Sequence, residues 1–274
     1  MNYIDIHGHI NFDDYDADRS EVIKRAQEAG VGMILVGTDL ESSKKVVELA
    51  NAHGDMWAII GQHPTEKAVF DYEKFLELAQ NTKVVGIGEC GLDYFHSKPE
   101  DITLQKENFL AHIRLANEVN KPLMLHIREA KKLRPTLRGL PSVSVSADLP
   151  NVPTGAYQEA VQILKEHAKV HANFHFFAGN IEDVKAGLEI GASFSFTGVL
   201  TFTKDYDEVV RMIPLESIMS ETDCPFVAPA PYRGKRNEPS YVIETVKATA
   251  RLKGLNEDVV AAQLVTNAKR FFCI

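Results

Sequence analysis

Apolar segments of strand length alternate with segments of helical periodicity along nearly the whole chain. Residues 31–37 (VGMILVG) form a continuously apolar run, which is expected where a parallel strand is covered on both faces. Residues 19–29 place apolar side chains at helical spacing and are followed by Gly30, a common residue just past a helix end. The pattern repeats and predicts eight strands, at residues 3–9, 31–37, 56–60, 83–88, 122–126, 170–175, 192–196 and 217–220.

This regular alternation indicates a parallel sheet, because a parallel strand needs a crossover helix to reach its neighbour. Eight such units in 274 residues favour closure into a (β/α)8 TIM barrel over an open sheet. We therefore predict a single α/β domain that spans residues 1–274.

Residues 131–155 interrupt the pattern. They contain four prolines, four basic residues and one acidic residue, and they show no clear periodicity. Because they follow the fifth strand, we predict that they form a lid at the mouth of the barrel. The alternative is a tolerated surface insertion, since a long loop adds little closure entropy.

Composition excludes several classes of protein. The net charge of -8 disfavours a broad basic surface that would hold duplex nucleic acid nonspecifically. No stretch is apolar enough to span a membrane, and the N-terminus opens on a strand rather than on a signal peptide. The three cysteines show no paired spacing. We therefore expect a cytoplasmic protein without disulfides, with no membrane association and no obligate protein partner.

Residues that can bind metals stand at the ends of several predicted strands. In a barrel, these C-terminal ends form one mouth, where the chemistry takes place. The first strand ends at two histidines that share one face, because side chains alternate along a strand. The candidate ligands are His7, His9, Glu89, His126, His175 and Asp223. Four histidines and two carboxylates are the composition of a two-metal site with mixed nitrogen and oxygen ligands.

Plainer alternatives exist for these residues. His126 and His175 could be hydrogen-bonded core histidines, and either Glu221 or Asp223 could cap the loop after the eighth strand. We favour Asp223 as the ligand. His63 follows the third strand without a second ligand beside it, so we expect it to contact substrate or to support a ligand. Other histidines and two cysteines are expected to be structural: His53, His96, His112, His167, His171, Cys90 and Cys224.

The sequence carries, in chain order, the motifs HGH, GQHP, GIGECGLDYF, KPLMLHIREA, HFFAG, ETDCP, PYRGKRNEPSYV and NAKRFF. In this it resembles the TatD family of metal-dependent deoxyribonucleases, within the amidohydrolase superfamily. The resemblance implies a two-metal hydrolase in which Glu89 bridges the ions. The implied ligand sets are His7, His9, Glu89 and Asp223 for one ion, and Glu89, His126 and His175 for the other.

The resemblance also places four residues near a phosphate-binding rim: Arg128, Arg233, Arg236 and Asn237. One departure concerns the segment between His126 and His175, which is longer than the family pattern leads us to expect. The excess coincides with residues 131–155 and leaves the size of the substrate open.

The activity that we predict is hydrolysis of phosphodiester bonds in DNA, from an exposed single-stranded or 3′ end. Two divalent ions, magnesium, manganese or zinc, would be the cofactors. Asp223 would act as the base, and Arg128 and Arg236 would bind phosphate oxygens. An acyl hydrolase with the same centre, such as an aminoacyl-tRNA deacylase or a lactonase, is the alternative. A noncatalytic binding scaffold is a third hypothesis.

Overall fold

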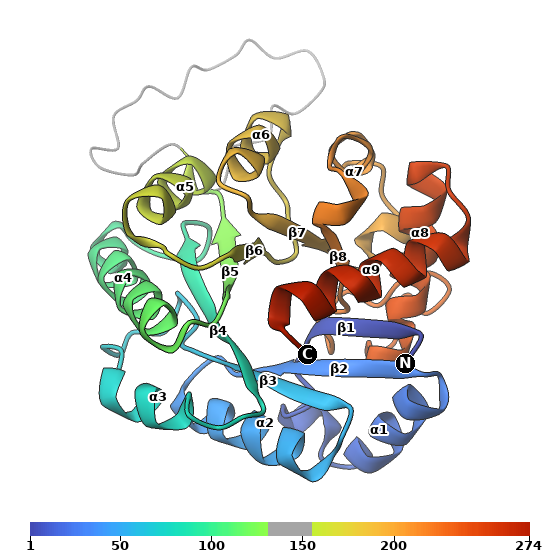
Figure 1. Cartoon of the computed structure of the whole chain (residues 1–274), viewed down its shortest axis with the longest axis horizontal. Coiled ribbons are helices and arrows are strands. Elements are labelled where there is room, and N and C mark those ends of the chain that lie inside the picture. The colour runs from blue at the N-terminus through green and yellow to red at the C-terminus, as the bar shows by residue number, and fades with distance from the viewer. Residues whose placement is uncertain (131–154) are drawn as a thin grey trace.

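The computed structural model describes residues 1–130 and 155–274. It confirms the predicted TIM barrel: eight parallel strands follow one another around the sheet in chain order, with helices outside them (Figure 1). The strands are β1 (Tyr3–Gly8), β2 (Val31–Val36), β3 (Met56–Ile60), β4 (Val84–Asp93), β5 (Leu123–Arg128), β6 (Ala172–Phe174), β7 (Ser193–Phe196) and β8 (Ile218–Ser220). The predicted lid at 131–155 lies outside the described residues, except for Gly155.

Nine α-helices are seen in these two ranges, and at least one follows each strand. After β5 this helix is α5, which begins beyond the undescribed segment. They are α1 (Arg19–Glu28), α2 (Leu40–Ala52), α3 (Tyr72–Leu78), α4 (Ile102–Val119), α5 (Ala156–His167), α6 (Ile181–Glu189), α7 (Asp207–Met212), α8 (Val242–Lys253) and α9 (Glu257–Phe272). None of these helices combines the length and the apolar character needed to cross a bilayer.

Two apolar cores hold the barrel together. A large one lies between the strands and the surrounding helices. A smaller one includes Ile4 and Ile6 of β1 together with apolar side chains of β2, β3, β4, β5 and β8. Ala268 and Phe272 of α9 join this smaller core, so α9, the second helix after β8, helps to bury the barrel interior.

The strand β4 is longer than the sequence predicted. We expected it to end at Gly88, but it continues through Glu89 to Asp93. Gly88 has a φ of +144°, and a Cβ at this position would collide with the carbonyl oxygen of Met124 in β5. Only glycine therefore fits there, directly before the candidate ligand Glu89.

The first and last strands meet at the segment that follows β8. A bridge joins Gly8 to Cys224, and the backbone N–H of His9 donates to the carbonyl of Cys224 at 2.8 Å. The N–H of Asp223 donates to the carbonyl of His7 at 2.9 Å. The hydrogen bonds that close the barrel thus run between residues proposed from the sequence as metal ligands and their neighbours.

His112 in α4 has the structural role that the sequence predicted. Its Nε2 accepts from the N–H of Gln62 at 2.9 Å, and its Nδ1 is 2.7 Å from the carbonyl of Asn108. Burial lowers the pKa of His112 to about 4. The folded protein therefore holds this imidazole neutral over a pH range in which the unfolded chain protonates it.

We expect the free energy of unfolding to fall as the pH drops from about 6.5 to about 4, because the unfolded state then binds more protons. For this one group the loss is on the order of 3 kcal/mol. Urea unfolding at pH 7 and pH 4.5 should show His112→Gln clearly less stable than wild type at pH 7 and much closer to it at pH 4.5. His167→Gln, an exposed control, should follow wild type. A stability difference for His112→Gln that is the same at both pH values would contradict this role.

Candidate metal centre

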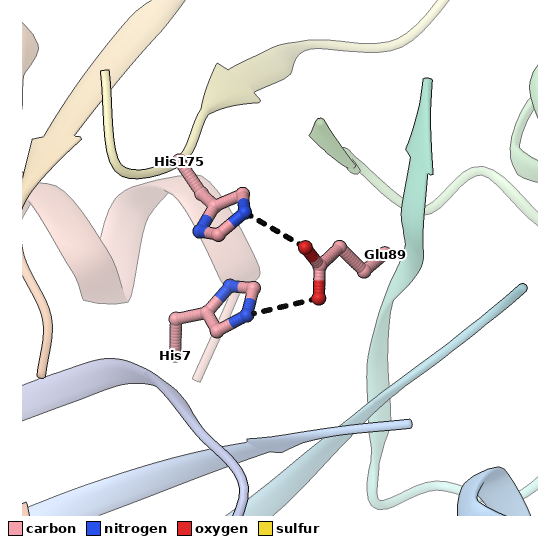
Figure 2. Close-up of side chains that lie close together, drawn as sticks. All are labelled: His7, Glu89 and His175. Carbon is pink, nitrogen blue, oxygen red and sulfur yellow. Dashed lines mark ion pairs between the residues drawn. The ribbon is translucent and has the colours of Figure 1, made fainter. Parts of the chain in front are cut away.

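Glu89 lies at the centre of the cluster of candidate ligands. Its carboxylate is buried, and Oε2 is 3.3 Å from Nε2 of His7 and 3.7 Å from Nε2 of His9. Figure 2 shows His7 and His175 directed at the two oxygens of this carboxylate. The two imidazole rings are stacked, with centroids 3.9 Å apart. One oxygen of Glu89 therefore faces the end of β1.

The other oxygen of Glu89 faces a second group of histidines. Its Oε1 is 2.8 Å from Nδ1 of His126, 2.9 Å from Nε2 of His175 and 3.5 Å from Nε2 of His63. The five histidines around Glu89 stand in or just after β1, β3, β5 and β6, which are separated along the chain. Glu89 is thus placed to contact two groups of ligands at once.

The ring of His9 is held by the backbone. Its Nδ1 is 2.9 Å from the carbonyl oxygen of Val36, which leaves Nε2 directed at the centre. This Nε2 is 3.1 Å from Nε2 of His7 and 3.5 Å from Oδ1 of Asp223. His7, His9 and Asp223 therefore present ligand atoms close enough to one another to hold one ion.

Glu221 and Asp223 have different partners. Glu221 is fully buried, and its Oε2 is 3.2 Å from Nδ1 of His175, while its Oε1 accepts from the N–H of Phe176 at 2.6 Å. The side chain of Asp223 is 13% exposed and lies beside His7 and His9. Glu221 can therefore orient His175 from behind, whereas Asp223 reaches the open side of the centre.

Asp93 is a site residue that the sequence reasoning missed. It is fully buried at the end of β4, with Oδ2 3.1 Å from Nε2 of His126 and 2.8 Å from Nδ1 of His96. Burial alone would raise its pKa, but these two histidines hold the pKa of Asp93 below its ordinary value. The sequence signal that could have identified Asp93 is the alternation of side chains along a strand. Asp93 lies four positions after Glu89, so both can share a face of β4, but we expected this strand to stop at Gly88.

Burial and neighbouring side chains together set the protonation state of each buried group. Burial alone would raise the pKa of Glu89, but nearby imidazoles, His175 first, hold it well below its ordinary value. Burial would lower the pKa of His175, yet Glu89 and Glu221 raise it well above its ordinary value. Burial and the neighbouring His126 lower the pKa of His63 to about 3. At neutral pH the centre therefore contains an ionised Glu89 and a neutral His63.

These residues fit divalent metal ions. Ligand atoms of a tetrahedral zinc, with bonds of about 2.0–2.1 Å, lie about 3.3 Å from one another. Such a spacing matches the 3.1 Å between the two Nε2 atoms of His7 and His9 and the 3.3 Å between His7 and Glu89. Three groups among the described residues could each hold an ion: His7, Glu89 and His175; His7, His9 and Asp223; His63, Glu89 and His126.

The third group changes the view of His63. From the sequence we expected it to stand without a second ligand beside it. Its Nε2 is 3.5 Å from Oε1 of Glu89, however, which is closer than the 3.7 Å between Nε2 of His9 and Oε2 of Glu89. Its Nδ1 is 2.7 Å from the hydroxyl of Thr65, which fixes the ring. His63 is thus among the residues that could bind a metal directly.

The model of the TatD-related DNase family matches residues 4–273. The chain belongs to the TatD family. Among its relatives, a protein of Bacillus subtilis (strain 168) named uncharacterized metal-dependent hydrolase YabD is 37% identical, with 98% of each chain covered. A 3'-5' ssDNA/RNA exonuclease TatD from Pantoea ananatis (strain LMG 20103) is 31% identical, again with 98% of each chain covered.

Solved structures of the TatD family share the fold. The crystal structure of YJJV, a TatD homolog from Escherichia coli K12, superimposes with a TM-score of 0.82 at 23% identity, covering 100% of this chain and 98% of that one. A TatD family hydrolase from Entamoeba histolytica gives a TM-score of 0.80 at 22% identity, covering 98% of this chain and 97% of the other.

The four rim residues of the TatD resemblance lie in different surroundings. Arg128 is exposed at the end of β5, with its guanidinium 4.6 Å from the ring centroid of Phe95. The guanidinium of Arg233 lies 3.8 Å from the ring centroid of Phe202, and its Nη1 donates to the carbonyl of Ala228 at 2.9 Å. The resemblance implies that both residues lie near a phosphate-binding rim, and a phosphate contact by either of them stays a prediction.

Arg236 and Asn237 are engaged within the protein. Arg236 forms an ion pair with Asp18 at 2.7 Å. Asn237 is fully buried, and its Nδ2 donates to the carbonyls of Thr222 and Phe226. These bonds fix the loop after β8, so a direct substrate contact by Asn237 would require this loop to move. Substrate binding by these two residues stays a prediction.

Proposed function

We propose that this protein hydrolyses phosphodiester bonds of DNA with two divalent metal ions bound around Glu89. The observation that carries the proposal is the placement of the two oxygens of Glu89, each of which faces a separate group of ligand atoms. In this proposal His7, His9 and Asp223 hold one ion, and His126 and His175 hold the other. Magnesium, manganese and zinc are the candidate ions.

Divalent ions bound here would supply Lewis-acid activation of water and neutralise charge on the phosphate. Asp223, partly exposed beside His7 and His9, would take a proton from the attacking water and return it to the leaving alkoxide. Arg128 would bind nonbridging oxygens, because a planar guanidinium can donate two parallel hydrogen bonds to one phosphate. Buried Glu221 and Asp93 would hold the rings of His175 and His126 in position.

For the substrate, we infer an exposed single strand that is digested from its 3′ end. The relative from Pantoea ananatis, named a 3'-5' ssDNA/RNA exonuclease, supports this choice. The net charge of -8 also favours a short local contact over tracking along a duplex. The cytoplasmic location predicted from the sequence belongs to the same proposal.

Single-stranded DNA, duplex DNA, RNA and an aminoacyl ester should be assayed side by side after chelation, with magnesium, manganese and zinc added back separately. We expect no turnover after chelation and the fastest restored hydrolysis on single-stranded DNA. Restored hydrolysis of the aminoacyl ester alone would favour the acyl-hydrolase alternative. Turnover of single-stranded DNA that survives complete removal of metal would overturn the proposed mechanism.

Asp93→Asn tests whether Asp93 orients the ring of His126. The amide keeps the size of the side chain but removes the charge that fixes which nitrogen of His126 faces Glu89. We expect metal affinity to fall by about 10- to 100-fold, as for other groups that orient a ligand. Titration with zinc, followed by metal analysis, measures the change.

The matched control for Asp93→Asn is His96→Ala. It removes the other histidine that contacts Asp93, on the exposed side, and leaves His126 untouched. We expect near wild-type metal affinity for this variant. Equal losses of metal affinity in the two variants would mean that Asp93 supports the segment after β4, through His96, rather than the ring of His126.

A further inference from the structure

Two phenylalanine rings lie beside the candidate metal centre, on the loops that follow β1 and β8. The ring of Phe12 is stacked on the ring of His9, with centroids 4.7 Å apart and planes 12° apart. The ring of Phe226 meets Phe12 edge-on at 6.4 Å. We call these two rings the aromatic shelf.

The aromatic shelf is held in place relative to Asp223, the proposed general base. The backbone N–H of Phe226 donates to the carbonyl of Asp223 at 2.9 Å, and Phe12 is held through its contact with the candidate ligand His9. Phe226 nevertheless stays 51% exposed. An apolar ring that is half exposed and adjacent to a reaction centre offers a flat surface to a bound group.

Beyond Phe12 the surface is acidic. An open groove of about 770 Å³ runs from Phe12 along the start of α2, and it is lined by five carboxylates and two lysines, Lys44 and Lys45. Both lysines are already paired, Lys44 with Glu41 at 2.8 Å and Lys45 with Asp13 at 3.6 Å. The groove therefore repels a phosphate chain that would continue past the aromatic shelf.

These observations rest on the proposed function and deepen it. We propose that the aromatic shelf stacks the terminal base of an unpaired DNA strand, and that the acidic groove excludes any nucleotide beyond it. Stacking on an aromatic ring tolerates every base, since each has a π-face. A base in a duplex is already paired and stacked, so the shelf selects unpaired ends.

The test compares Phe226→Leu with Phe226→Tyr, because leucine keeps the apolar volume but lacks the flat ring. The substrates are a single-stranded oligonucleotide, the same strand with a 3′-terminal abasic nucleotide, the same strand with a 5′-terminal abasic nucleotide, and a circular single strand. Val259→Ala, an exposed apolar position on α9, is the control variant. Metal content and circular dichroism should match wild type in every variant.

We expect the KM of wild type to rise about tenfold when the 3′-terminal base is missing, and to stay unchanged when the 5′-terminal base is missing. Phe226→Leu should show the raised KM on the intact strand, with kcat little changed, and should no longer distinguish the 3′-abasic strand. Phe226→Tyr and Val259→Ala should behave as wild type, and the circular strand should not be cleaved.

Wild-type KM values for Phe226→Leu on both strands would overturn the shelf while leaving the proposed function standing. Efficient cleavage of the circular strand would overturn the shelf together with digestion from the 3′ end, but not metal-dependent hydrolysis of phosphodiester bonds. Failure of wild type to hydrolyse any of the oligonucleotides would instead overturn the proposed function, and the shelf with it.

Discussion

Glu89→Gln is expected to abolish hydrolysis while the barrel stays folded. The carboxylate of Glu89 faces ligand atoms on both of its oxygens, and a negative charge between two cations offsets their mutual repulsion. The amide is neutral and can offer only one oxygen, so at least one ion should be lost. Circular dichroism and metal analysis on the same preparation would separate loss of the centre from loss of the fold.

Glu89→Asp is the matched comparison for that result. It keeps the charge but draws both oxygens back by one methylene, so we expect partial metal binding and intermediate activity. Full metal loading of Glu89→Gln, together with wild-type rates, would show that this carboxylate does not bridge.

Asp223→Asn should keep much of the metal and lose kcat by about 10² to 10⁴, the usual contribution of a general base. His7 and His9 remain to hold the ion, and the amide oxygen of Asn can still coordinate it. The amide cannot act as a base, however, because it does not accept a proton. Steady-state kinetics with metal content measured in parallel would test this.

The control for Asp223→Asn is His171→Ala, since His171 directly precedes β6 at the opposite end of the barrel. We expect this variant to retain wild-type kcat. Equal losses of activity in the two variants would contradict the assignment of chemistry to the C-terminal mouth.

Sequence periodicity was enough to predict the barrel, because each buried parallel strand is a nearly continuous apolar run. It was not enough to predict which face each ligand occupies. Ile4 and Ile6 point into the barrel interior, so strict alternation would turn His7 outward. The pairing of β1 with β2 shifts between Asp5 and Gly8, and His7 reaches the centre. Such a shift has no local signature in the sequence.

The residues that support the ligands were harder to predict than the ligands. Asp93 and Glu221 act on His126 and His175, from which they are separated by 33 and 46 positions in the chain. A contact of this kind depends on the packing of whole strands rather than on local spacing. Arg236 shows the converse, since a motif position expected at the rim is tied to Asp18 by an ion pair.

The seam between β1 and the segment after β8 has a consequence for how the protein is made. The hydrogen bonds that close the barrel join residues 7 and 9 to residues 223 and 224, the first and last parts of the proposed centre. A nascent chain therefore carries His7 and His9 long before Asp223 is made, and it cannot complete the proposed centre until the segment after β8 has left the ribosome. Truncated products should be catalytically silent, so an unfinished copy of this hydrolase poses no risk to nucleic acid.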